Sequence, residues 1–195
     1  MSAPHLMVAQ FVTDNHEANC WIAACTDTRQ AMIIDVPTAD PRIFRYLDAH
    51  GLRLAGVFIT HTHYDHVGGL EELLAKHPVP VYAAVSLPCR HSTTIVKAGR
   101  EIPLGVVKGR VVETPGHTPE SISLILPGAV FTGDALFCGS IGGTTNDRDK
   151  QQELGAVREH ILSLPDDYLI CAGHGPSSTI GVERNFNPFF NPPIK

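Results

Sequence analysis

The residues best suited to chemistry lie in one short stretch, 60–69, which reads THTHYDHVGG. It places three imidazoles (His61, His63 and His66) and one carboxylate (Asp65) within six residues, directly after an apolar run that predicts a buried strand. Four such polar groups at the end of an apolar strand are hard to satisfy by packing and ordinary hydrogen bonds alone. Neutral imidazole and carboxylate are ligands that zinc accepts, so the stretch predicts a metal site.

Three later segments share one design, an apolar strand that ends in a polar residue next to glycine. Their tips are Gly116-His117, Gly133-Asp134 and Gly173-His174. Any one of them alone would be explained as a capped or hydrogen-bonded polar residue, but four strand ends that all carry His or Asp point to a shared site. Glycine beside each tip lets the backbone approach closely. Because strand ends collect at one edge of a sheet, we expect these side chains to converge on residues 61–66.

The elements that must position these side chains follow from periodicity and turn residues. Asp40 and Pro41 predict the start of a helix that Gly51 ends, and two more helices are expected over 69–76 and 149–164. Residues 86–109 predict irregular surface excursions, and the tail 185–195 is rich in Asn, Pro and Phe. Strands are expected over 6–12, 20–25, 31–35, 54–59, 79–84, 110–113, 121–126, 129–132 and 168–172. Strand runs interleaved with a few helices predict a layered α/β arrangement with helices outside two sheets.

Bulk properties limit the function classes. A chain of 195 residues with 43% hydrophobic content predicts one domain over 1–195. The net charge is −5 with scattered basic residues, which argues against a nucleic-acid partner. No apolar run reaches the ~20 residues that span a bilayer, so no membrane association is expected. Met1–His5 shows no signal-peptide pattern, and the five cysteines lack Cys-x-x-Cys spacing, so a cytoplasmic protein with reduced thiols is predicted.

The order of the polar residues closely resembles the metallo-β-lactamase superfamily over nearly the whole chain. The resemblance implies an α/β fold, namely the single-domain αββα four-layer sandwich, with a two-metal site at one edge of the sheets. By that resemblance one metal is held by His61, His63 and His117, the other by Asp65, His66 and His174, and Asp134 bridges the two.

The segment 173–189, together with 114–119 and 133–137, is similar to the glyoxalase II (hydroxyacylglutathione hydrolase) branch, especially its short single-domain members. This resemblance implies a binuclear thioesterase that cleaves a small-molecule S-acylglutathione-like thioester through a metal-bridging hydroxide, with Asp65 and Asp134 as catalytic carboxylates. The cofactors expected are two divalent metal ions. Zinc is favoured, and iron and manganese suit the same ligands.

One departure from that branch concerns the thiol carrier of the substrate. The branch usually has Arg or Lys shortly after the bridging aspartate, where it grips the glycine carboxylate of glutathione, and here Gly143 stands in that place. The missing cation removes a charge-assisted contact. Candidate substrate-binding residues are Phe137, Cys138, Arg148 and Arg184.

Other reactions fit the same ligands. A persulfide dioxygenase would use one iron on His61, His117 and Asp134, and the stretch 116–123 is compatible with that branch, whereas 183–189 argues for glyoxalase II. A lactone or other ester hydrolase is a third possibility. A non-enzymatic metal-binding module is the fourth, and the complete ligand set argues against it.

Overall fold

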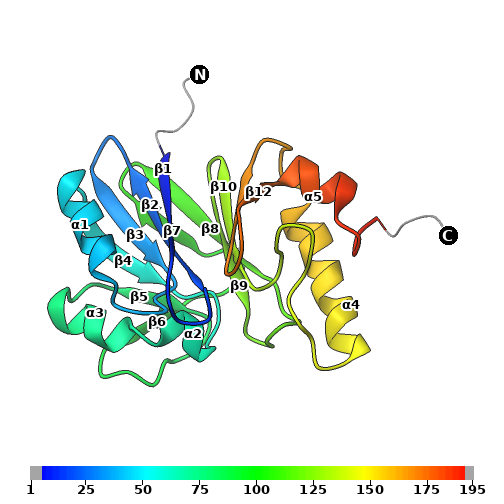
Figure 1. Cartoon of the computed structure of the whole chain (residues 1–195), viewed down its shortest axis with the longest axis horizontal. Coiled ribbons are helices and arrows are strands. Elements are labelled where there is room, and N and C mark those ends of the chain that lie inside the picture. The colour runs from blue at the N-terminus through cyan, green and yellow to red at the C-terminus, as the bar shows by residue number, and fades with distance from the viewer. Residues whose placement is uncertain (1–5, 192–195) are drawn as a thin grey trace.

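The side chains of β2 (Asn19–Cys25) enter two different cores. Cys20, Ile22 and Ala24 pack in one core, while Trp21 and Ala23 pack in another. Because successive side chains of a strand point to opposite faces, such a strand must be covered on both sides. The structure, a computed structural model that describes residues 6–191, has the layered architecture that this requires (Figure 1).

The first of two sheets has the strand order β1-β2-β3-β4-β5-β6. β1, β2 and β3 are antiparallel, and the pairs from β3 to β6 are parallel. The parallel strands β3 and β4 therefore end at the same edge of the sheet. The bounds of the other five strands are Leu6–Val12 (β1), Gln30–Ile34 (β3), Arg53–Phe58 (β4), Val81–Ala83 (β5) and Thr93–Ile95 (β6).

The second sheet has the order β12-β11-β10-β9-β8-β7. Its strands are antiparallel except for β10 and β11, which run parallel and so end side by side. The bounds are Glu101–Leu104 (β7), Val107–Glu113 (β8), Ile122–Leu126 (β9), Ala129–Gly133 (β10), Leu169–Ala172 (β11) and Ser178–Thr179 (β12).

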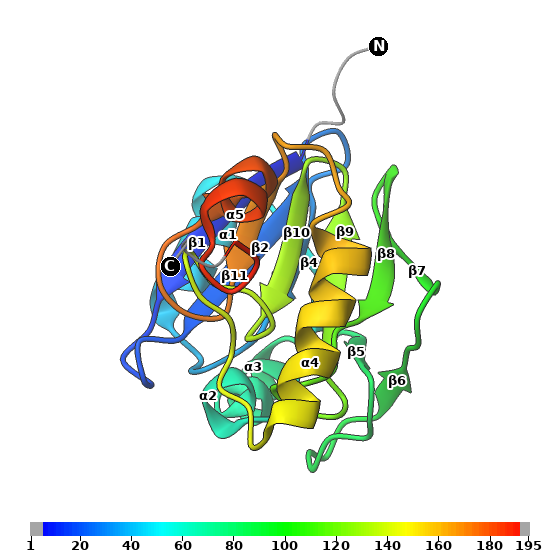
Figure 2. The ribbon, with the colours of Figure 1, turned by 90° about the vertical axis from the view of Figure 1, so that its right-hand side faces the viewer.

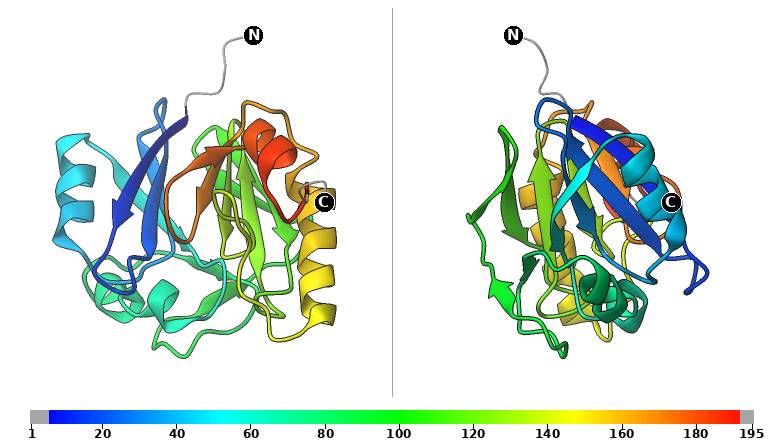
Figure 3. Two further views of the ribbon diagram at one scale, coloured as in Figure 1. Left: turned by 45° about the vertical axis from the view of Figure 1, so that its right-hand side comes forward. Right: turned by 90° about the vertical axis from the view of Figure 1, so that its left-hand side faces the viewer.

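Helices cover the outer faces of both sheets (Figures 2 and 3). One apolar core lies between the first sheet and its helices, a second between the sheets, and a third between the second sheet and its helices. The predicted αββα single-domain fold is thereby confirmed, while the bounds 1–195 stay a prediction. The helices are α1 (Pro41–Ala49), α2 (Tyr64–Val67), α3 (Leu70–Lys76), α4 (Asp147–Ala156), a π-helical turn η1 (Val157–Ile161) and α5 (Ile180–Phe186).

The predicted start of the helix at Asp40 and Pro41 is confirmed. Asp40 caps α1 by accepting a hydrogen bond from the Arg42 N–H, and Pro41 opens the helix. None of the five cysteines is paired, and Cys20, Cys25 and Cys171 are buried. Within residues 6–191 no helix has the length and apolar character needed to cross a bilayer. The Met1–His5 segment and the last four residues of the tail lie outside the described part.

The prediction of irregular structure over 86–109 is wrong for ten of these 24 residues. It contains β6, β7 and the start of β8. In β7 the residues Glu101, Ile102, Pro103 and Leu104 alternate between exposed and buried, which is the pattern of a half-buried strand. Its four residues, one of them Pro, made the alternation too short to recognise in the sequence.

The predicted helix 149–164 is also corrected. It begins two residues earlier, where Asn146 caps α4 by accepting from the Asp149 N–H, and it continues as the π-helical turn η1. Helices α2 and α5 were not predicted, because four and seven residues are too few for an apolar period to show.

The contact between the two sheets generates a stability prediction. Phe131 in β10 is fully buried, and its ring lies 6.3 Å from that of Trp21 in an edge-on arrangement. We expect Phe131→Ala to lower the free energy of unfolding by about 3–5 kcal/mol, because it removes buried apolar surface and leaves a cavity. Urea unfolding measures this. Val106→Ala, at a side chain that is 71% exposed, is the control and should change stability by less than ~0.5 kcal/mol. Equal losses in both variants would contradict the packing argument.

Candidate metal centre

Four strand ends deliver seven ligand-type side chains to one edge of the sandwich. β4 leads into His61, His63, Asp65 and His66; β8 leads to His117, β10 to Asp134 and β11 to His174. Three overlapping groups have ligand atoms within 4.8 Å of one another: His61, His63 and His117; His61, His66 and Asp134; and Asp65, His66 and His174. The convergence expected from the sequence is therefore present.

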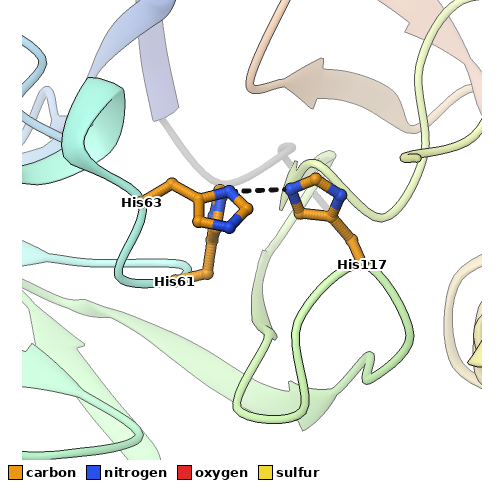
Figure 4. A group of neighbouring side chains, drawn as sticks. All are labelled: His61, His63 and His117. Atoms are coloured by element: carbon orange, nitrogen blue, oxygen red, sulfur yellow. Dashed lines mark hydrogen bonds between the residues drawn. The ribbon is translucent and has the colours of Figure 1, made fainter. Parts of the chain in front are cut away.

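In the first group three imidazoles face one another (Figure 4). The Nδ1 atom of His63 lies 3.1 Å from the Nε2 atom of His61 and 2.9 Å from the Nε2 atom of His117. Three ring nitrogens directed at one point match the arrangement of histidines around a tetrahedral zinc ion.

The carboxylate of Asp134 lies between this group and the others. Its Oδ2 atom is 3.5 Å from His117 Nε2 and 3.6 Å from His174 Nε2, and its Oδ1 atom is 3.3 Å from His66 Nε2. On the outer side, His174 Nε2 lies 3.2 Å from Asp65 Oδ2. One carboxylate thus contacts members of both ligand groups.

Two buried atoms of this cluster test whether a cation fits. His66 Nε2 and Asp134 Oδ1 are inaccessible to solvent and have no hydrogen-bond partner within residues 6–191, although they lie 3.3 Å apart. Leaving a buried polar atom unsatisfied costs about 1–3 kcal/mol. A divalent cation between them would satisfy both, and nitrogen and oxygen ligands without sulfur suit zinc, iron or manganese.

The cluster is closed on one side and open on the other. His61, His66 and Asp134 are buried, whereas the side chains of Asp65 and His174 are 21% and 28% exposed. A structural metal site is closed by four protein ligands, while a catalytic site keeps an open position. Solvent can therefore reach the outer side of the cluster.

Asp35 is a buried residue that holds the cluster through hydrogen bonds, and it was not among the residues predicted from the sequence. Its Oδ2 atom accepts hydrogen bonds from His66 Nδ1 at 2.8 Å and from the Thr60 hydroxyl at 2.7 Å, and its Oδ1 accepts from the Thr60 N–H at 2.8 Å. The bond to Nδ1 fixes the ring so that Nε2 points to the cluster. The sequence did contain a signal for this role, because Asp35 ends the predicted strand 31–35 just as the other polar residues end theirs.

Two further bonds orient the other rings. The Nδ1–H of His117 donates to the carbonyl of Gly143 at 2.7 Å, which directs Nε2 into the cluster. The Thr60 hydroxyl donates to Asp35, so it accepts from His61 Nδ1 at 3.1 Å. The carbonyl of Gly143 could not be found from residue types, because every residue has one.

Burial and charge set the ionisation of the inner residues in the absence of metal. Burial, aided by the neighbouring His66, lowers the pKa of His61 to about 2. Burial would raise the pKa of Asp134, but the close approach and charge of His66, whose Nε2 lies 3.3 Å from Oδ1, outweigh it and lower that pKa to about 2. Burial also works against the charged form of His66, yet Asp35 and Asp134 raise its pKa to about 10. A neutral His61 and an ionised Asp134 are ready to ligate, while a cation must displace a proton from His66.

Besides Asp134, one more buried carboxyl group near the cluster has oxygens without a hydrogen-bond partner among the described residues. Glu153 of α4 is fully buried, and neither carboxyl oxygen has a hydrogen-bond partner among the described residues. Burial, with a smaller contribution from the charge of Asp134, raises its pKa to about 8. A methyl group placed on Gly142 would lie 3.0 Å from both Glu153 Oε1 and His117 Cβ, so Glu153 lies behind the segment that orients His117.

The predicted substrate-binding residues fall in different places. The ring of Phe137 is 6.1 Å from that of His174, and the neighbouring Cys138 is exposed. Arg148 is exposed on the first turn of α4. Arg184 donates through Nε to the carbonyl of Leu162 and also contacts Leu164 and Asp166, so its guanidinium is committed to that loop. The structure gives its substrate role no support.

Comparison with known proteins identifies the class to which this fold and cluster belong. The family model described as the metallo-beta-lactamase superfamily matches residues 14–174. The chain belongs to the metallo-β-lactamase superfamily, as the ligand order indicated. Membership of this superfamily implies divalent metals, which agrees with the two buried atoms that lack partners.

Individual relatives are similar over most of this chain. It is 39% identical over 161 residues to a hydroxyacylglutathione hydrolase of Alkalilimnicola ehrlichii, covering 79% of this chain but only 60% of that relative. It is 32% identical over 189 residues to the hydroxyacylglutathione hydrolase GloC of Haemophilus influenzae, covering 85% of this chain and 89% of the relative. The crystal structure of ETHE1 from Myxococcus xanthus is 29% identical, with a TM-score of 0.84 over 93% of this chain and 83% of that one.

The coupling of His66 to Asp35 predicts a pH dependence of the metal-free protein. The pKa of His66 is about 10 in the folded state against 6.5 for an ordinary histidine, so between these values the folded chain holds a proton that the unfolded chain has lost. This stabilisation is complete below about pH 6.5 and is lost as the pH rises towards 10. After chelation, we expect the free energy of unfolding to fall over that range.

Asp35→Asn should make that fall shallower, because it removes a carboxylate that raises the pKa of His66. Urea titrations at a series of pH values measure both slopes. Glu72→Gln, which removes an exposed carboxylate paired with Lys76, is the control and should keep the wild-type slope. An unchanged slope in Asp35→Asn would refute the coupling.

Proposed function

We propose that this chain is a metal-dependent thioester hydrolase of the glyoxalase II type that binds two divalent ions. His61, His63 and His117 hold one ion, and Asp65, His66 and His174 hold the other, with Asp134 shared between them. The observation that carries the proposal is the buried Asp134 carboxylate, whose two oxygens face members of both groups. The hydroxyacylglutathione hydrolases of Alkalilimnicola ehrlichii and Haemophilus influenzae support the substrate class.

When bound, two such ions would supply a water whose pKa is lowered towards ~7 and a positive charge that polarises a carbonyl oxygen. The residues of this chain supply the geometry. Asp35 and Gly143 hold His66 and His117 with one ring nitrogen directed inward. We assign Asp65 and Asp134 as the catalytic carboxylates: Asp134 is buried between the two ligand groups and would hold both ions, while Asp65 lies at the open side, where it would orient the attacking water.

Zinc is the ion that we favour, and iron and manganese suit the same donors. The substrate would enter from the open side, where Asp65 and His174 are partly exposed. Phe137 lies beside His174 and forms an apolar wall there. A small acyl thioester can reach this side, with its carbonyl towards the ions and its acyl or thiol portion against Phe137.

A persulfide dioxygenase is the second candidate function, because His61, His117 and Asp134 also meet, as one iron would require. His61 Nε2 and His117 Nε2 lie 4.0 and 3.5 Å from Asp134 Oδ2. The 3.2 Å approach of His174 to Asp65 favours a second ion and thus the hydrolase. Thiol release from S-lactoylglutathione without oxygen supports the hydrolase, whereas oxygen uptake with glutathione persulfide and one tightly bound iron supports the dioxygenase. Lactones and esters belong in the same substrate panel.

Removal of the shared carboxylate tests the two-metal proposal. We expect Asp134→Ala to reduce the metal content from about two ions per chain to one or fewer and to lower thioester hydrolysis by at least ~100-fold, because the ions supply several kcal/mol of transition-state stabilisation. Elemental analysis and a thiol-release assay measure these effects. Asp166→Ala, at an exposed carboxylate that pairs with Arg184, is the control. Full activity in Asp134→Ala would end the proposal.

The position of Gly143 offers a test of the thiol carrier. A Cβ atom added there meets no atom within 4 Å, and the backbone carbonyl that orients His117 is kept. We expect Gly143→Lys to lower the KM for S-lactoylglutathione by roughly tenfold, since an ammonium can pair with the glycine carboxylate of glutathione.

The matched control is Gly155→Lys, which adds the same charge at an exposed and equally open position of α4. It should leave the KM unchanged. If both variants lower KM equally, general charge attraction explains the effect. If neither does, the glutathione carboxylate does not lie near Gly143.

A further inference from the structure

One short segment, residues 137–143, contacts both sides of the cluster, and we call it the rim segment. At its start, the ring of Phe137 lies edge-on to His174 at 6.1 Å. At its end, the carbonyl of Gly143 accepts from His117 Nδ1 at 2.7 Å. A shift of the rim segment would therefore move an apolar wall beside one ligand group and the orienting partner of the other.

The rim segment is fixed by a buried carboxylate far along the chain. Glu183 of α5 is 1% exposed, and its Oε2 atom accepts a hydrogen bond from the Gly139 N–H at 2.9 Å. Ser178 donates to Oε1 at 2.5 Å, and Asn187 donates to Oε2 at 2.8 Å. A buried carboxylate is costly unless it is hydrogen-bonded, and here three donors surround it.

Asn187 adds a second link to the same segment. Its side-chain amide also donates to the carbonyl of Ser140 at 3.2 Å. Phe137 and Ser140 close a tight turn through two backbone hydrogen bonds of 3.0 and 3.3 Å. Glu183 and Asn187 thus bind a backbone N–H and a backbone C=O of one turn.

We propose that Glu183 is a positioning residue, which holds the rim segment so that a substrate meets Phe137 and the His117 side of the cluster in a fixed geometry. The hydrogen-bond partners of the Glu183 carboxylate are Gly139, Ser178 and Asn187 and include no ligand-type side chain of the cluster, so its action runs through Gly139 and Asn187. The kinetic part of this inference rests on the proposed thioester hydrolysis. The structural part, which concerns the order of residues 137–143, does not.

The test combines hydrogen exchange with kinetics on the metal-loaded enzyme. Glu183→Gln keeps the size of the side chain but replaces one carboxylate oxygen by an NH2 group. This group cannot accept the hydrogen bonds that Gly139, Ser178 and Asn187 donate. We expect exchange of the 138–141 amides to become about tenfold faster or more, and the KM for S-lactoylglutathione to rise about tenfold, because a hydrogen bond to a buried charge is lost. The kcat should stay within about twofold, with the metal content unchanged.

Thr179→Ala is the matched control at the N-cap of the same helix. Thr179 caps α5 by accepting from the Val182 N–H at 3.4 Å, and the structure shows no bond from its side chain to the rim segment. It should weaken α5 but leave the exchange at 138–141 and the KM as in the wild type. If Thr179→Ala matches Glu183→Gln in both measurements, general loosening of α5 explains them and the proposal is overturned.

Asn187→Ala covers the case in which Glu183→Gln fails to fold. It keeps the carboxylate and its bonds to Gly139 and Ser178, yet removes the bond from Asn187 to Glu183 and the link to Ser140, so it should give the same changes in smaller measure. Unchanged exchange in the folded variants refutes the positioning role. A wild-type enzyme that releases no thiol from any thioester refutes the proposed function instead, while the exchange data still decide the role of Glu183.

Discussion

The candidate metal centre depends on one buried interaction, the contact of Asp35 with His66 and Thr60. The carboxylate of Asp35 fixes the imidazole of His66 through Nδ1 and accepts both the N–H and the hydroxyl of Thr60. Thr60 in turn accepts from His61, so the rings of His61 and His66 are oriented from one point. Asp35 has a φ of 58°, which is costly for a residue other than glycine. This backbone conformation at the end of β3 places the Asp35 carboxylate within hydrogen-bond distance of Thr60, which follows β4, and of His66.

Close backbone approach is the second constraint on the cluster. A methyl group on Gly173 would lie 2.1 Å from Asp134 Oδ1, and one on Gly133, whose φ is +50°, would lie 2.4 Å from the Thr60 hydroxyl. β10 and β11 run parallel and adjacent, so their ends lie side by side. Asp134 and His174 can come together there only because the residue before each of them is glycine. The two glycines therefore serve the geometry of the ligands, as their positions beside the strand tips suggested.

Much of the fold and of the candidate site could be predicted because both follow from local signals. Apolar runs ending in His or Asp marked the four strand ends, and their order along the chain matched a known family. The strands β6 and β7 were missed because three or four residues at the edge of a sheet carry little apolar pattern. Glu183 lay in a segment that resembled a family, but its contact with Gly139, 44 residues away, has no local signature.

The sequence by itself determined which ligand-type side chains gather at the strand ends and in what order, because imidazoles and carboxylates at the ends of apolar strands are too polar to be satisfied by packing alone. Only the tertiary structure decided how those side chains are oriented. The carbonyl of Gly143 that holds His117, the carboxylate of Asp35 beneath His66 and the bond from Gly139 to Glu183 all join distant segments. Residue types name the groups that can make hydrogen bonds, but the packing of the two sheets and their helices selects which of them meet.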